Sequence, residues 1–175
     1  MRKIVLTFGL IAGAMLAAMM LLVLPFQDQM GFDRGAFIGY TAMVLAFLMV
    51  FFGVKSYRDN VAGGSVTFGR AFKVGLLITA VATVCYVAAW ELVYYKLAPD
   101  FTDKYAAHAV EKARKAGASD AQIAEKAKEM EDFKKLYSNP LVNIAFTFLE
   151  PLPVGLVFTL VTAGVLSRKR RPAAS

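Results

Sequence analysis

Long runs of apolar residues recur four times along the chain, separated by short polar loops and by one longer charged segment. The runs cover residues 4–26, 36–54, 72–95 and 141–166. The hydrocarbon core of a bilayer takes about 20 apolar residues per helix, and a helix that is apolar on every side does not suit the surface of a soluble protein. The pattern therefore predicts four membrane-spanning helices within one membrane domain, residues 1–175.

The first run follows Arg2 and Lys3, as the apolar part of a secretion signal would. However, it continues well past the roughly 7–15 residues of a signal sequence, and no clear cleavage site comes after it. We therefore expect the first run to remain in the protein as a spanning helix.

Residues 100–137 differ from these runs because they are rich in charged residues and alanine. Pro99 ends the third run, and the pattern then predicts a first helix that stops near Gly117, a residue type common at helix ends. Ser119, with Gln122 three residues later, has the pattern of a capping box and starts a second helix. We expect a helical hairpin. Its modest apolar stripe packs on the membrane or on the other helix, or alternatively docks an extracytoplasmic partner.

Basic residues are distributed unevenly among the loops. They gather near the N-terminus, in residues 55–73 and in residues 168–171, whereas the loop after the first run has Asp28, Asp33 and only one base. Because short basic loops stay in the cytoplasm, both termini and the 55–73 loop are expected inside and residues 100–137 outside. The net charge of +7 then reflects topology and not nucleic-acid binding.

The composition agrees with a membrane protein, since 58% of the residues are hydrophobic and the mean hydropathy is +0.53. Small residues also recur at four-residue steps within the runs, as at Gly9 and Gly13 and at Gly35 and Gly39. In lipid, such faces allow helix backbones to approach closely. We predict an all-α fold, an integral membrane four-helix bundle with an extracytoplasmic helical hairpin between spans three and four. The alternative use of such a face is to bind another protein.

Two acidic residues, Glu91 and Glu150, fall inside the predicted spans. Glu91 lies near the outer end of its span, from which its side chain reaches the interface, whereas Glu150 lies deeper and is followed by Pro151 and Pro153. Prolines kink or break a helix, and an acid at membrane depth points to a functional site. One interpretation is a polar lock between helices, in which Glu150 is protonated or bonds Thr147, Thr159 or a hydroxyl of the third span. The other is an ion or proton site. Both acids belong to the same half of the bilayer, which suggests a shared polar pocket.

Residue types that carry familiar chemistry are scarce. Cys85 is the only cysteine and His108 the only histidine, whereas zinc takes three or four ligands. Residues 62–65 lack the Gly-Lys-Ser continuation of a phosphate-binding loop. We therefore expect no enzymatic activity, no cofactor and no metal site.

The loop between the second and third runs carries a distinctive pattern. It reads Lys55-Ser56-Tyr57-Arg58-Asp59 and, after a short gap, Gly63-Gly64-Ser65-Val66-Thr67-Phe68-Gly69-Arg70. This pattern, with Phe8 to Gly13 in the first run, resembles an uncharacterised bacterial membrane family, domain of unknown function 4199. The resemblance implies four spans, an outer helical insertion and a bacterial inner membrane, but no activity.

The motif positions are Lys55, Tyr57, Arg58, Gly64 and Phe68. Lys55 and Arg58 fall at the expected level of the cytoplasmic headgroups, so one interpretation is that they hold lipid phosphates. The other is that the loop only sets the topology, with its paired glycines allowing a tight reversal of the chain.

These observations favour a small scaffold or accessory protein that contacts membrane lipid or a membrane-protein partner. The alternative is a small ion or proton pathway, formed by a homo-oligomer, that uses Glu150 in a proline-broken helix.

Overall fold

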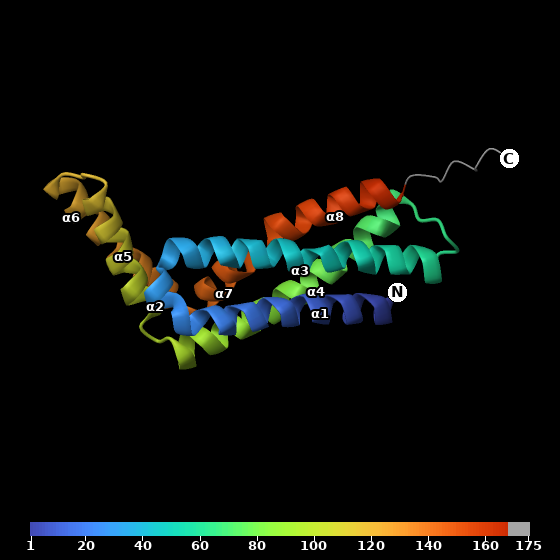
Figure 1. Cartoon of the computed structure of the whole chain (residues 1–175), viewed down its shortest axis with the longest axis horizontal. Coiled ribbons are helices and arrows are strands. Elements are labelled where there is room, and N and C mark those ends of the chain that lie inside the picture. Colours follow the sequence, from blue (N-terminus) through green and yellow to red (C-terminus); the bar gives the residue numbers. More distant parts are fainter. Residues whose placement is uncertain (168–175) are drawn as a thin grey trace.

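The computed structural model describes residues 1–167, and this part of the chain is helical with no β-strand. Figure 1 shows long helices lying side by side, with a shorter pair projecting at one end. In chain order the helices are α1 (Arg2–Val23), α2 (Gln27–Met30), α3 (Phe32–Asn60), α4 (Phe68–Leu92), α5 (Phe101–Lys115), α6 (Asp120–Tyr137), α7 (Pro140–Leu149) and α8 (Leu152–Leu166). A 3-10 turn, Leu24–Phe26, joins α1 to α2, and a π-helical turn, Val93–Leu97, extends α4.

Four helical segments are long and apolar enough to cross a membrane, as the four apolar runs predict. They are Arg2–Met30, Phe32–Asn60, Phe68–Leu97 and Pro140–Leu166. The second is longer than its apolar run because α3 continues into polar residues at both ends. At its C-terminal end, Lys55 pairs with Asp59 one turn later, a spacing that supports a helix in water as well as in lipid.

Helix α4 occupies the centre of the assembly. Both α1 and α8 pack against α3 and α4, while α7 packs on α4 and α6. The side chains of Phe47, Val50, Val74 and Ile78 fill the space between these helices with at most 1% of their surface exposed. The N-terminus and the α3–α4 loop lie at one end, and the α5–α6 hairpin lies at the other, which we call the hairpin end (Figure 1).

Close helix packing depends on glycines, as the small-residue pattern predicts. A Cβ atom on Gly13 of α1 would lie only 2.4 Å from Cys85 Cβ on α4. The expectation for span two is wrong at Gly39, where a Cβ would meet nothing within 4 Å among residues 1–167. The reason is that Gly39 lines a cavity in which α3 stands apart from its neighbours. At Gly35 a Cβ would meet the end of the Gln27 side chain at 2.8 Å, and at Gly53 it would meet Ile78 of α4 and Phe8 of α1.

The hairpin begins and ends its helices as expected. Ser119 and Gln122 form the reciprocal bonds of a capping box, and Gly117 has a φ of +81° at the turn. The end of the apolar stripe nearest the long helices is buried rather than free, because Phe133 packs on Tyr105 of α5 and on Phe146 of α7.

Candidate functional site

The fourth long segment is broken at Glu150, as the two following prolines predict. Helix α7 ends at Leu149 and α8 begins at Leu152. Pro151 and Pro153 have no backbone N–H, so the carbonyls one turn before them lose their usual helical donors. The break therefore leaves Glu150 next to backbone acceptors that the helix does not satisfy.

Glu150 accepts a hydrogen bond from the hydroxyl of Tyr86 on α4, with an O···O distance of 2.8 Å. This is the geometry of the polar lock, in which a hydroxyl from the third span bonds Glu150. A second polar link joins the same two segments on the other side of the break, where the Thr79 and Thr159 hydroxyls lie 3.2 Å apart.

A chain of polar side chains continues from α7 toward the hairpin. Asn143 is fully buried, and its Oδ1 accepts hydrogen bonds from Trp90 Nε1 at 3.1 Å and from the Thr147 hydroxyl at 3.3 Å. The Tyr137 hydroxyl of α6 lies 3.4 Å from that of Thr147. The sequence interpretation missed Asn143. The spacing of polar residues could have identified it. Asn143, Thr147 and Glu150 follow one another at steps of four and three residues, so they share one helix face.

Five of these polar residues, Tyr86, Trp90, Tyr137, Thr147 and Glu150, border a cavity of about 450 Å³ at the hairpin end. Tyr86, Thr147 and Glu150 form one wall, and side chains of α1 and α3 form the opposite wall. Tyr105 and Phe133 of the hairpin line it as well. A volume of this size is typical of a small-molecule site.

The structure does not bring the two membrane acids together. Glu150 lines the cavity and Glu91 does not, and within residues 1–167 no hydrogen bond or ion pair joins them. Glu91 Oε1 is buried without a hydrogen-bond partner in the described part of the chain. The described residues therefore show no contact that would form the shared pocket. The polar side chain that contacts Glu150 is Tyr86.

We expect Glu150 to be energetically coupled to Tyr86. In a double-mutant cycle of Glu150→Leu and Tyr86→Phe, unfolding in detergent should give a coupling energy of about 1 kcal/mol, the range of hydrogen bonds between membrane helices. The matched cycle of Glu150→Leu and Glu91→Leu should be additive. Equal coupling in the two cycles would instead restore the shared pocket of the two acids.

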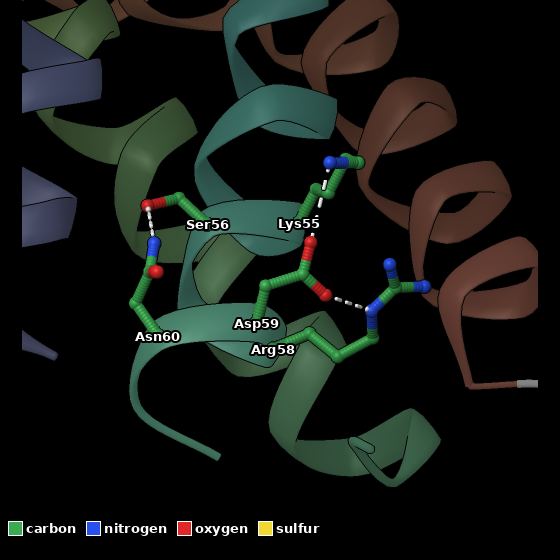
Figure 2. A network of polar contacts seen from close by, with 5 residues as sticks. All are labelled: Lys55, Ser56, Arg58, Asp59 and Asn60. Atoms are coloured by element: carbon green, nitrogen blue, oxygen red, sulfur yellow. Dashed lines mark hydrogen bonds and ion pairs between the residues drawn. The ribbon is translucent and has the colours of Figure 1, made fainter. Parts of the chain in front are cut away.

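The last turns of α3 contain the second candidate site, shown in Figure 2. Asp59 lies between the two motif cations, with its Oδ2 3.2 Å from Lys55 Nζ and its Oδ1 2.7 Å from Arg58 Nε. Beside them, Asn60 Nδ2 donates to Ser56 Oγ at 3.2 Å. Because the Asp59 carboxylate pairs with both cations, Lys55 and Arg58 present less positive charge to a lipid phosphate than the sequence suggests.

The rest of the motif shapes the reversal between α3 and α4. Gly63 and Gly64 both have a positive φ, +68° and +87°, a conformation that favours glycine, and the Gly64 N–H donates to the Arg58 carbonyl at 2.9 Å. Tyr57 packs against the buried core, and Phe68 stacks on Phe72 with ring centroids 6.1 Å apart. The predicted tight turn is confirmed.

Within residues 1–167 the fold defines an all-helical protein with four helices of membrane-spanning length. A family model described as Protein of unknown function (DUF4199) matches residues 7–168. This match covers most of the chain, so the protein belongs to that family, as the loop pattern indicates. A search of curated proteins and a search of solved structures each found no match.

Proposed function

We propose that this protein is a small accessory protein of a bacterial inner membrane, which holds its α5–α6 hairpin outside the cytoplasm to contact a membrane-protein partner or lipid. In this orientation both termini and the α3–α4 loop face the cytoplasm, which the distribution of basic residues supports. The protein has no catalytic role in this proposal.

The bracing of the hairpin carries the proposal. Lys104 Nζ of α5 lies 2.9 Å from Asp28 Oδ2 of α2, and Lys112 Nζ lies 2.7 Å from Asp33 Oδ1 of α3. The hydrogen bond that Lys104 donates to the Asp28 carboxylate raises the pKa of Lys104 above its usual value. Phe32 of α3 packs its ring against Phe101 and Tyr105 of α5. A hairpin held at both α2 and α3 is a fixed platform, which suits a contact surface better than a free loop.

A small ion or proton pathway through Glu150 is the second candidate. The helix break favours it, because broken helices in transporters present carbonyls and acids to ions. The packing beyond the cavity opposes it. Phe47, Val50 and Ile78 are completely buried between the cavity and the α3–α4 loop, so a pathway requires that these helices move or that a second copy completes it.

Native mass spectrometry of the protein extracted from its own membrane in mild detergent tests the first candidate. We expect a complex with a second polypeptide, and we expect Lys104→Ala with Lys112→Ala to reduce it by releasing the hairpin. Each exposed pair contributes only about 0–1 kcal/mol, so both are removed together. The control is Lys115→Ala with Lys135→Ala, since these lysines form ion pairs only within their own helices among residues 1–167.

A complex that survives the loss of both braces would contradict the role of the hairpin. A bare homo-oligomer would favour the pathway instead. In that case, ion flux in proteoliposomes should be lost in Glu150→Gln while the amount of folded protein stays unchanged.

A further inference from the structure

The cavity at the hairpin end has an unusual lining. Nine of the 24 residues around it are aromatic, and Glu150 is the only Asp, Glu, Lys, Arg or His among them. Tyr86 donates a hydrogen bond to Glu150, and Trp90, four residues later on α4, shares its helix face. Tyr137 of the hairpin and Phe146 of α7 line the same cavity. Aromatic faces carry partial negative charge and attract cations, most strongly where water is excluded.

Glu150 has no cationic partner within residues 1–167. Its side chain accepts a hydrogen bond from the neutral Tyr86 hydroxyl, and the ion pairs of the described part of the chain do not include it. Acids at membrane depth pair with one another, with backbone groups or with an ion or substrate that they bind. The cavity therefore holds a carboxylate beside aromatic rings, and none of its lining residues within 1–167 is a cation. This arrangement is complementary in charge to an ammonium group.

We propose that this cavity binds a net cationic amphiphile. Its ammonium group lies between Glu150 and the rings of Tyr86 and Trp90, and its apolar part lies against Met19, Met20 and Ile38 of α1 and α3. The site goes beyond the accessory role proposed above, because it is independent of any protein bound by the hairpin.

The lining also selects against a zwitterionic phospholipid. Such a headgroup would bring a phosphate next to the Glu150 carboxylate, and among residues 1–167 no lysine or arginine lines the cavity to neutralise it. The volume of about 450 Å³ suits a molecule with one short apolar group and lies in the range of small-molecule sites.

Trp90 provides the measurement, because it is the only tryptophan of the chain and lines the cavity. The full chain in dodecyl maltoside is titrated with benzyltrimethylammonium while tryptophan emission is followed. The comparison ligand is neopentylbenzene, which has the same shape with carbon in place of the charged nitrogen. We expect saturable binding of the ammonium compound. The neutral compound should bind at least about tenfold more weakly.

Glu150→Gln should weaken ammonium binding by about tenfold while leaving the neutral ligand unaffected. The matched control is Glu91→Gln. Glu91 is the other acid within a spanning helix, but it does not line the cavity, so this variant should keep the wild-type affinity. The comparison of the two ligands on the wild-type protein holds even if a variant fails to fold.

Equal binding of both ligands, or unchanged ammonium binding by Glu150→Gln, would overturn the proposal. A short-chain phosphatidylethanolamine is then added as a competitor. Displacement of the probe by this lipid would overturn the selection of a net cation and assign the cavity to a zwitterionic headgroup, whereas a lack of displacement supports it.

Discussion

Replacing Gly155 with alanine is expected to lower the free energy of unfolding by about 2 kcal/mol, the usual cost of overfilling a packed core. A Cβ at Gly155 would lie 2.4 Å from Thr79 Cγ2 and 3.1 Å from the ring of Phe47. To make room, the Thr79 side chain must rotate. That movement breaks its contacts with the Thr159 hydroxyl at 3.2 Å and the Gly155 carbonyl at 3.5 Å.

The chain supplies a control on the same helix. Among residues 1–167, a Cβ at Gly164 of α8 would meet nothing within 4 Å, so Gly164→Ala should be neutral or stabilising by up to about 1 kcal/mol, since alanine favours helices over glycine. Unfolding of both variants in mixed micelles, followed by Trp90 fluorescence, measures the difference.

Thr79→Ser offers a rescue of Gly155→Ala. It removes the Cγ2 methyl that the new side chain would meet and keeps the hydroxyl that links α4 to α8. The double variant should recover most of the lost stability, although the ring of Phe47 must still yield slightly. If Gly155→Ala is as stable as Gly164→Ala, the close approach of α8 to α4 is not a feature of the folded protein in its membrane.

Features that depend on local sequence could be predicted. The length of an apolar run matches the thickness of a bilayer, so the four long helices follow from the pattern alone. The break at Pro151 and the start of α6 at Ser119 also follow, because a missing N–H or a capping side chain acts within one helical turn.

Contacts between distant segments could not be predicted. Gly39 and Gly53 are both glycines on α3, yet only Gly53 faces a close neighbour, because the use of a small residue depends on which helix lies opposite. In the same way, Lys104 and Asp28 are 76 residues apart, and no local pattern connects them.

The candidate site was recognised only in part for the same reason. Glu150 and its prolines stand out in an apolar run, whereas Tyr86 is one of several hydroxyl-bearing residues that could have faced it. Asn143 carries no charge, so it attracts no attention until its spacing to Thr147 and Glu150 is noticed. The cavity itself arises because α7, beyond the helix break, packs on α4 and α6, while α8 packs on α3 and α4.

Replacing Asn143 with leucine is expected to destabilise the protein by about 1 kcal/mol, although leucine is more apolar and of similar size. Asn143 Oδ1 is the acceptor for two donors, Trp90 Nε1 and the Thr147 hydroxyl. A donor buried without a partner costs about 1–3 kcal/mol, and the values measured in membranes lie toward the lower end. Trp90 Nε1 loses its acceptor, whereas the Thr147 hydroxyl keeps the Tyr137 hydroxyl 3.4 Å away. The substitution also removes Asn143 Nδ2, which is buried without a hydrogen-bond partner among residues 1–167, so the net loss is about 1 kcal/mol. Unfolding in mixed micelles, followed by far-UV circular dichroism, measures it.

The same substitution distinguishes a structural network from an incidental contact. If the network contributed nothing, leucine at this depth would raise stability through better packing and transfer from water. Trp90→Phe in the Asn143→Leu background removes the donor that has lost its acceptor and should recover most of the loss. Asn60→Ala, at the exposed end of α3, should change stability by no more than about 0.5 kcal/mol. A leucine variant at least as stable as wild type would show that the polar chain from Trp90 to Thr147 serves the cavity and not the fold.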